Sequence, residues 1–267
     1  MEISSIHNPK VKQVVVLQQK SSERRKSGLF VVEGRRELMH CLNAGYECHS
    51  LFVKEALAES VIKDDVWLKA VPEQSVYTVS DDVYSKMAYR EGTEGVVAVM
   101  KSKNHSLEQL ALSDKPLIIV LERVEKPGNL GAVLRTADAA HADAVIVCDP
   151  LTDLYNPNLI RSSIGAVFTV PCVACSSSEC IDFLKLHDIQ ILTAQLQDSK
   201  LYYNTDMTVP TAIVMGTEST GLTDLWRNVA DAHIRIPMLG ALDSLNVSVS
   251  TAILLFEAVR QRQKVLV

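Results

Sequence analysis

The chain has 267 residues, of which 47% are hydrophobic and 22% are charged. This balance is ordinary for a folded globular protein and excludes intrinsic disorder as the main state. No apolar run approaches the ~18 residues of a membrane span, and the amino-terminal residues lack the apolar core of a signal peptide. We therefore expect a water-soluble, cytoplasmic protein of one large or two modest domains, with no membrane partner.

The net charge of −5 argues against nonspecific coating of nucleic acid by the whole chain. Residues 1–40 differ, because they contain eight basic and four acidic residues and so carry +4, which leaves −9 on the remainder. A basic edge on an acidic body is typical of local contact with a polyanion, although the same charges could simply solvate a turn. The basic residues of this edge are Lys10, Lys12, Lys20, Arg24, Arg25, Lys26, Arg35 and Arg36.

Six cysteines are spread through the chain, unlike the dense pattern of a disulfide-rich secreted domain, so we expect reduced thiols. Cys172 and Cys175 form a C-x-x-C pair with Cys180 close behind, but no second pair and no H-x-x-x-H pattern accompanies them. Structural zinc sites draw four ligands from such patterns, so the sequence predicts no metal site. A thioredoxin-like role is disfavoured, because the pair precedes a run of serines.

Short helical and strand patterns alternate in the amino-terminal part of the chain. Helices are predicted over 10–20 and over 35–44, where Gly45 supplies a stop. We expect a small α/β domain over 1–103, followed by a polar linker over 104–116 that contains one short helix. The predicted strands, which are rich in β-branched residues, are 30–33, 50–54, 76–80 and 95–100.

Beyond the linker, continuous apolar strands alternate with helices. Unbroken apolar runs indicate strands that are buried on both faces, so the pattern predicts a mainly parallel sheet with helices on both sides. The fold class is therefore α/β, and we expect this sheet to form a second domain over 117–267. Helices are expected from about Asn129 and from about Ser244. The predicted strands are 117–122, 144–149, 189–194, 211–216 and 233–237.

Three segments of the second half each follow a predicted strand and lead into a loop or a helix. This placement brings them to the carboxyl edge of the sheet, where open α/β folds bind ligands. No G-x-G-x-x-G or phosphate-loop pattern occurs, which disfavours a nucleotide-dependent oxidoreductase on a doubly wound sheet. The segments are 121–143, 213–222 and 234–261, and they contain KPGNLGAVLRTAD (126–138), GTESTGL (216–222) and IPMLGALDSLNVSVSTAI (236–253).

The first two segments combine glycines with a few polar side chains. Asn129 is expected to cap a helix, and Gly131 leaves room for close approach of a backbone or a ligand. Arg135 lies six residues after Asn129 and can face the same edge of the sheet. In the second segment, Glu218 can accept hydrogen bonds from a cationic partner or a base edge. Taken singly, these features also fit an ordinary helix cap, a surface arginine and a glycine-rich turn.

The third segment holds more short polar side chains than capping requires. Asp243 or Ser244 is expected to cap the last helix, and Asn246 and Ser248 follow within one turn. Such a surplus at a helix N-terminus is typical of a site that handles a hydroxyl or a phosphate, although local backbone bonding is the alternative. The apolar residues at helical spacing predict a buried stripe formed by Leu245, Val249, Ile253, Phe256 and Val259.

In order and spacing, the three segments resemble the motifs of the SpoU (TrmH-type) branch of the SPOUT RNA methyltransferases. The amino-terminal half, with NPKVK and GLFVVEGRREL, is similar to the substrate-binding domain that precedes many such catalytic domains. The resemblance implies a parallel α/β domain with a deep trefoil knot, S-adenosylmethionine as the cofactor, a homodimer, and methyl transfer to a ribose 2′-OH in ribosomal or transfer RNA. Two positions depart from the family pattern, because His141 and Ser219 stand where relatives often have glycine.

The same resemblance assigns roles to individual residues. Arg135 would hold the phosphate beside the target ribose, since a guanidinium is too basic to act as the proton acceptor. Asn129, Glu218, Ser244 and Asn246 would orient Arg135 and the ribose hydroxyl. The cofactor would lie against the backbone at Gly216, Ile236 and Leu245, with Met215, Met238 and Gly240 close by.

RNA would be selected by the amino-terminal domain through shape and phosphate contacts. The competing hypothesis is a catalytically silent RNA-binding protein with the same fold, which binding of S-adenosylmethionine would argue against. The residues expected to contact RNA are Lys10, Lys12, Arg24, Arg25, Lys26, Arg35 and Arg36.

Overall fold

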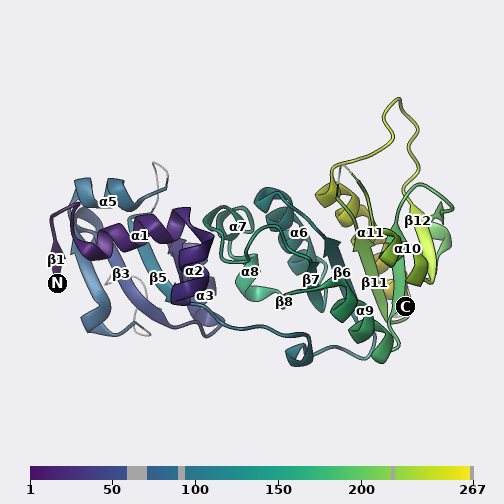
Figure 1. Ribbon diagram of the computed structural model, residues 1–267, viewed down its shortest axis with the longest axis horizontal. Coiled ribbons are helices and arrows are strands. Elements are labelled where there is room, and N and C mark those ends of the chain that lie inside the picture. Colours follow the sequence, from purple (N-terminus) through teal and green to yellow (C-terminus); the bar gives the residue numbers. More distant parts are fainter. Residues whose placement is uncertain (59–70, 90–93, 218–219, 265–267) are drawn as a thin grey trace. The chain divides into compact units, whose positions relative to one another are not determined.

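The computed structural model divides the chain into two compact units (Figure 1). Residues 1–104 and 153–169 form the first unit, and residues 105–152 and 170–267 form the second. Within the described ranges, no helix has the length and apolar character needed to cross a membrane. The residues that the structure describes are 1–58, 71–89, 94–217 and 220–264.

The first unit alternates short strands with short helices and a few 3₁₀ turns, so its α/β character agrees with the sequence prediction. Its described elements, in chain order, are β1 (Glu2–Ile3), α1 (Pro9–Gln19), α2 (Ser21–Ser27), β2 (Leu29–Glu33), α3 (Arg35–Asn43), β3 (Cys48–Lys54), η1 (Glu55–Leu57), η3 (Glu73–Ser75), β4 (Val76–Val79), α5 (Asp81–Met87), β5 (Val96–Lys101), α7 (Pro157–Ser162) and α8 (Ala166–Thr169).

A mixed sheet forms the centre of the first unit, with the described strands in the order β1-β4-β3-β5-β2. β4 is parallel to β1 and β3, whereas β5 runs antiparallel to both β3 and β2. α1 and α5 pack on one face, where Val14 and Leu17 meet Val83 and Met87 over the apolar side chains of the sheet. This core contains no residue of the second unit, so the first unit has its own hydrophobic centre.

The polar stretch at 21–28 forms α2, a helix that the apolar pattern did not predict. α2 ends at Gly28, whose φ of +65° places it in the left-handed region that favours glycine at a helix end. Arg24 is the buried residue of this helix, although the sequence suggests an exposed basic run. Burial of one arginine, not an apolar stripe, therefore fixes α2 on its unit.

The second unit is an α/β layer whose strands match the apolar runs predicted from the sequence. Its described elements, in chain order, are η4 (Leu107–Gln109), β6 (Leu117–Glu122), α6 (Pro127–Ala139), β7 (Ala144–Cys148), β8 (Cys172–Cys175), α9 (Ser177–Leu186), β9 (Gln190–Ala194), β10 (Lys200–Leu201), η5 (Tyr202–Asn204), β11 (Thr211–Met215), α10 (Asp224–Val229), β12 (Ala232–Arg235) and α11 (Val247–Lys264).

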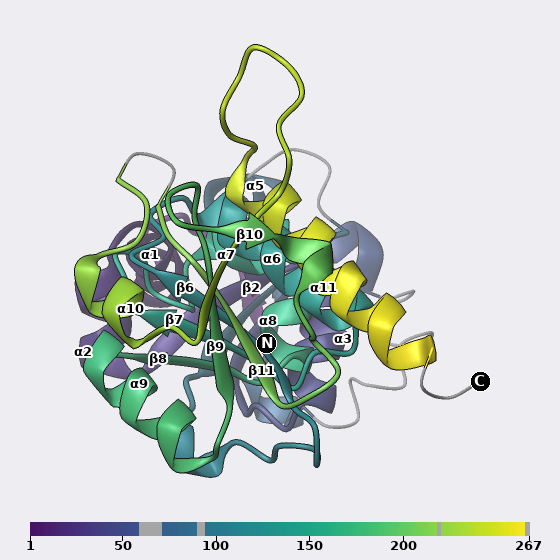
Figure 2. The same cartoon turned by 90° about the vertical axis from the view of Figure 1, so that its right-hand side faces the viewer.

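The described strands of this unit form one sheet in the order β10-β12-β9-β11-β6-β7-β8. Every pairing in it is parallel, which confirms the predicted parallel sheet. α9 and α10 pack on one face through a cluster that includes Leu184 and Trp226. α6 and α11 pack against each other and contact β7 and β11 (Figure 2). Helices on both faces explain why the strands read as unbroken apolar runs. The trefoil knot stays an expectation from the resemblance.

Residues 153–169 belong to the first unit, although the sequence analysis assigned them to the domain over 117–267. Aromatic packing accounts for this assignment. Tyr155 stacks on Phe30 with ring centroids 4.3 Å apart, and Phe168 lies 5.9 Å from Phe30. The Tyr155 hydroxyl also donates to the Lys103 carbonyl at 2.9 Å. The other predicted boundaries, including the linker over 104–116, stay predictions.

The stripe predicted to be buried on the last helix is not the buried one. Among the described residues of α11, the buried ones are Val247, Thr251, Leu254, Leu255, Glu257 and Ala258. In the predicted stripe, Leu245, Val249 and Phe256 are exposed, and Phe256 has 48% of its surface accessible. α11 therefore leaves an apolar face outward. The helix also begins at Val247, later than the predicted start near Ser244.

Candidate active site at the carboxyl edge of the parallel sheet

The three motif segments lie at one edge of the parallel sheet, as predicted. The segment over 126–138 follows β6, the segment over 216–222 follows β11, and the segment over 236–253 follows β12. β6 and β11 are neighbouring strands, and β9 separates β11 from β12. Since all of these strands are parallel, their carboxyl ends meet at the same edge.

Asn129 is a helical residue and not the cap of α6. The helix begins at Pro127 after Lys126, because proline is well accommodated at the first helical position. The Asn129 side chain therefore does not cap the helix. Its Oδ1 accepts a hydrogen bond from Nδ2 of Asn246 at 3.2 Å. This bond joins the first and third motif segments.

Asn246 caps α11, a role that the sequence analysis assigned to Asp243 or Ser244. Its Oδ1 accepts hydrogen bonds from the backbone amide of Ser248 at 3.0 Å and from the Ser248 hydroxyl at 2.6 Å. A single amide side chain thus fixes the start of α11 and reaches the start of α6. The exposed Ser244 hydroxyl donates to Asp243 at 3.2 Å and stays outside the helix.

A pocket of about 420 Å³ opens between the turn after β11 and the loop after β12. Most of the residues predicted to lie against the cofactor line it, and Gly240 is the exception. The pocket also contains residues that the sequence analysis did not single out, among them Gln195, Arg227, Val247 and Leu254. The predicted residues found in its lining are Met215, Gly216, Ile236, Met238, Ser244 and Leu245.

Gly216 lies in the pocket wall at a point where the backbone is packed too tightly for a side chain. A Cβ at this position would overlap the carbonyl group of Gly221 and the amide nitrogen of Leu222, so only glycine fits. The backbone amide of Gly221 donates to the Thr217 carbonyl at 3.0 Å, which closes the turn. The predicted Glu218, together with Ser219, lies outside the described residues.

Glu122 supports this turn, although the sequence analysis did not identify it. The carboxylate, 2% exposed at the end of β6, accepts hydrogen bonds from the Thr223 amide at 2.9 Å and from the Thr223 hydroxyl at 2.7 Å. Thr223 precedes α10, so these two bonds attach the loop after β11, which contributes to the pocket wall, to the neighbouring strand β6. A buried glutamate within an apolar run was the available signal, since such a group needs partners.

Arg135 is exposed on α6 and makes no hydrogen bond or ion pair with the described residues. It is absent from the pocket lining. The structure thus brings Asn129, Ser244 and Asn246 to the sheet edge and leaves the Arg135 guanidinium accessible to a ligand or to another chain.

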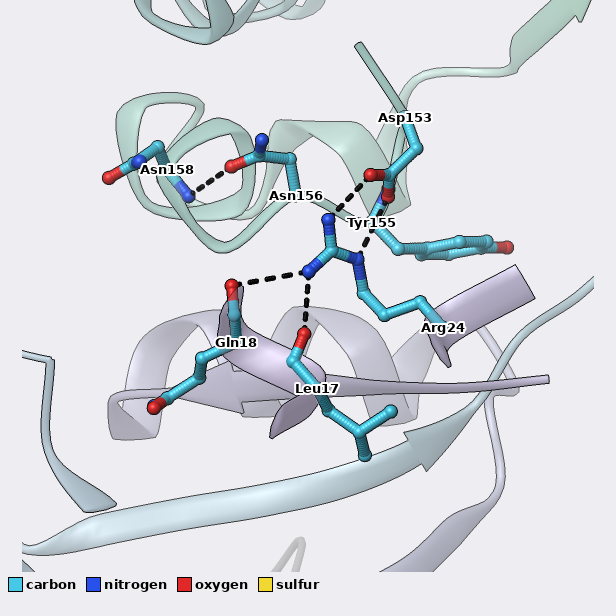
Figure 3. A network of polar contacts seen from close by, with 7 residues as sticks. All are labelled: Leu17, Gln18, Arg24, Asp153, Tyr155, Asn156 and Asn158. Carbon is cyan, nitrogen blue, oxygen red and sulfur yellow. Dashed lines mark hydrogen bonds and ion pairs between the residues drawn. The ribbon is translucent and has the colours of Figure 1, made fainter. Parts of the chain in front are cut away.

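Arg24, a predicted RNA contact, is buried in this structure, where its side chain is 5% exposed and all three guanidinium nitrogens are hydrogen-bonded (Figure 3). Its guanidinium binds both carboxylate oxygens of Asp153, at 2.6 and 3.2 Å. It also donates to the carbonyl of Leu17 at 2.5 Å and to that of Gln18 at 3.2 Å. Arg24 therefore ties α1 and α2 to the returning segment, and removing it would leave a poorly solvated carboxylate.

The other predicted RNA contacts lie on the first unit with differing exposure. Lys12, Arg25 and Lys26 are exposed. The Lys10 ammonium lies 4.9 Å from the centre of the Tyr77 ring, and Arg36 is 3.5 Å from Glu37. The Arg35 backbone amide donates to Glu94 at 2.6 Å. Arg25 and Lys26 are thus the adjacent cations best placed to meet a polyanion.

Comparison with known proteins places this geometry in a family. Residues 116–256 match the SpoU rRNA Methylase family, and residues 8–98 match the MRM3-like substrate binding domain. The chain is 31% identical to the 23S rRNA (guanosine(2553)-2′-O)-methyltransferase RlmP of Bacillus subtilis, covering 96% of this chain and 98% of that protein.

Solved structures agree over the whole chain. A crystal structure of an RNA 2′-O ribose methyltransferase has 38% identity and a TM-score of 0.83, covering 98% of this chain and 100% of that one. An AdoMet-bound rRNA methyltransferase from Sinorhizobium meliloti has 29% identity and a TM-score of 0.87, covering 97% of each chain. These matches confirm the resemblance drawn from the three motifs: the chain belongs to the SpoU rRNA methylase family.

Proposed function

We propose that this protein transfers the methyl group of S-adenosylmethionine to a ribose 2′-hydroxyl of ribosomal RNA. The observation that carries the proposal is the pocket in which the turn at Gly216, the strand end at Ile236 and the loop at Leu245 converge. The names of the relatives support the same chemistry, since RlmP acts on 23S rRNA and the Sinorhizobium enzyme was solved with AdoMet bound.

The pocket fits such a cofactor. Met215, Ile236 and Leu254 offer apolar surface for a flat base, and the bare backbone at Gly216 allows close contact with its polar edge. When bound, S-adenosylmethionine supplies an electrophilic methyl group on a sulfonium centre. Pocket residues hold the reacting groups in line, and such alignment is worth about 7–11 kcal/mol.

Arg135 is assigned to the phosphate next to the target ribose. A ribose hydroxyl is a weak nucleophile near neutral pH, so it requires a positioned proton acceptor. A guanidinium keeps its proton and instead binds phosphate oxygens in a fork. Arg135 therefore positions the phosphate, and a phosphate oxygen or a group relayed from it accepts the proton of the hydroxyl. Asn129 and Asn246, hydrogen-bonded to each other, set the starts of α6 and α11 relative to this group.

A second copy of the chain completes the site in this proposal. The outward apolar face of α11 includes Val249 and Phe256, and the loop before it exposes Leu239 and Leu242. Leu239 is 96% exposed, and apolar side chains grouped in this way mark interaction surfaces. Since α6 packs beside α11, a homodimer through this face places the accessible Arg135 near the interface.

The first unit provides the RNA-binding surface in this proposal, through exposed cations such as Arg25 and Lys26. Ribosomal RNA is the favoured substrate class, because RlmP, which the chain matches over nearly its full length, is named for 23S rRNA. A protein that modifies ribosomal RNA in a bacterial cell works in the cytoplasm, and we propose that location.

Arg135→Ala tests the assignment. We expect methyl transfer to ribosomal RNA from cells lacking the protein to fall by about 10²–10³-fold, as for loss of other transition-state donors. The affinity for S-adenosylmethionine, measured by calorimetric titration, should change less than twofold because Arg135 does not line the pocket. Lys185→Ala, an exposed cation on α9, is the control and should keep full activity.

Two results would contradict the proposal. Loss of cofactor binding in Arg135→Ala would overturn the role given to that residue. Absence of cofactor binding in the unmodified protein would favour the silent RNA-binding protein over an enzyme. Mapping of 2′-O-methyl positions in RNA from cells with and without the protein then identifies the target nucleotide.

A further inference from the structure

Three cysteines from separate elements converge in the second unit. Cys148 ends β7, Cys175 ends β8, and the two are paired residues of the parallel ladder, so their side chains leave the same face of the sheet. Cys180, on α9, covers that face. The three sulfur atoms all lie within 4.8 Å of one another.

This cluster is separate from the cofactor pocket, since none of the three cysteines lines that pocket. Cys148 and Cys180 are buried and Cys175 is half-buried, so Cys175 is the member of the cluster nearest to solvent. Next to it, the Trp226 indole donates to the Ser177 hydroxyl at 3.1 Å, and that hydroxyl donates to Asp149 at 2.6 Å. The Trp226 indole is fully buried and belongs to the same apolar cluster as Cys148 and Cys180.

We propose that Cys148, Cys175 and Cys180 bind one soft divalent metal ion of the zinc type. Zinc–thiolate bonds of about 2.3 Å in tetrahedral geometry put the sulfur atoms roughly 3.8 Å apart. The present spacing therefore requires the three sulfurs to close by at most about 1 Å. Cys175, as the member of the cluster nearest to solvent, leaves the fourth position to a water molecule.

The site bears a net negative charge when it holds a divalent ion, and its surroundings offset part of that charge. Binding turns three thiols into thiolates and releases three protons to solvent, so a divalent ion leaves a net charge of −1. Cys175 directly precedes Ser176, the N-cap of α9, and the positive end of the helix stabilises that charge. The carboxylates of Asp149 and Glu179, each adjacent in sequence to a cluster cysteine, favour the approach of a cation.

The ion would join the ends of two strands to the helix that covers them. Metal binding of this kind adds to folding stability, because the unfolded chain does not hold the three sulfurs together. The same three residues could instead pack as small apolar side chains, as buried cysteines often do. The two possibilities differ in whether the folded protein takes up metal.

Cadmium titration of the full-length reduced protein distinguishes a metal site from simple packing of the three thiols. The thiolate-to-cadmium charge-transfer absorption should rise to a plateau at one ion per chain, and zinc should displace the cadmium and raise the thermal midpoint. Cys175→Ser should weaken binding by more than the roughly 10–100-fold that loss of an outer-shell partner costs. Cys172→Ala is the control, because Cys172 lies on β8 outside the cluster and is equally a buried thiol.

Cys180→Ala provides a second variant, and circular dichroism verifies that each variant is folded. The proposal is overturned if the unmodified protein absorbs no more than Cys175→Ser, or if Cys172→Ala loses the absorption to the same extent. Recovery of a disulfide between two cluster cysteines, with no metal uptake after its reduction, would also overturn it.

Discussion

Gly216 has no room for any side chain, since a Cβ there meets the backbone of Gly221 and Leu222. Gly216→Ala must therefore displace the turn that forms the pocket wall. We expect its dissociation constant for S-adenosylmethionine to rise at least tenfold, about 1.4 kcal/mol, in calorimetric titration. Gly128→Ala is the matched control, because a Cβ at Gly128 has nothing within 4 Å. Equal affinities of the two variants for S-adenosylmethionine would show that the turn at Gly216 does not contribute to cofactor binding.

His141 occupies a left-handed position with φ of +52° at the end of α6. Its amide donates to the Asp138 carbonyl, and the next amide donates to Ala137, the hydrogen-bond pattern that usually contains glycine. This explains why a resemblance to the family suggests glycine here. His141→Gly should raise the free energy of unfolding by about 1 kcal/mol, as seen by urea denaturation. His141→Ala keeps the strained φ and should not. If the free energy of unfolding rose in both variants, the gain would come from removal of the imidazole and not from the backbone conformation.

At the residue scale, local roles were predicted unevenly. Gly216 and Asn246 were singled out from a turn and from a helix start, but the caps expected at Asn129 and at Asp243 or Ser244 lie instead at Lys126 and Asn246. Long-range partners could not be predicted: Arg24 pairs with Asp153 across 129 residues of sequence, and Glu122 with Thr223 across 101. The cysteine cluster was missed for the same reason, because Cys148 belongs to a different strand from the C-x-x-C pair.

Among the elements, strands were predicted more reliably than the orientation of helices. The seven described strands of the parallel sheet are covered by helices on both faces, so they require apolar runs. Those runs are visible in the sequence. α11 instead carries apolar residues on two faces, so helical spacing fits one stripe through Val249 and Phe256 and another through Leu254 and Ala258. Periodicity alone does not say which stripe faces the sheet. The surplus of apolar surface on α11 is itself the signal for a second partner.

Phe256→Glu tests that partner. A charge on the outward face of α11 should prevent association of two chains, because an unpaired carboxylate would be buried at the interface. Sedimentation velocity should show a dimer for the unmodified protein and a monomer for the variant, with loss of methyl transfer. Gln263→Glu adds the same charge at an exposed position of the same helix and should remain dimeric. A monomeric unmodified protein, or a dimeric Phe256→Glu, would contradict the homodimer.

For the whole molecule, the charge asymmetry predicted from the sequence holds after Arg24 is removed from the exposed set. Arg25→Ala with Lys26→Ala should weaken RNA binding and lower the slope of log K against log salt by about 1.4–1.8, since each phosphate contact contributes roughly 0.7–0.9. Filter binding over a range of salt concentrations measures the slope. Lys185→Ala should leave the slope unchanged. An unchanged slope in the double variant would mean that Arg25 and Lys26 are solvated cations on α2 that do not contact RNA.

The return of residues 153–169 to the first unit has a consequence for how such proteins are built. The polypeptide passes between the units three times, so no single break in the chain separates one from the other. A fragment ending at Asn104 would lack Asp153, Tyr155 and Phe168, and would strand the Arg24 charge and the Phe30 ring without their partners. Moving the first unit into another protein therefore requires residues 1–104 and 153–169 to be transferred together.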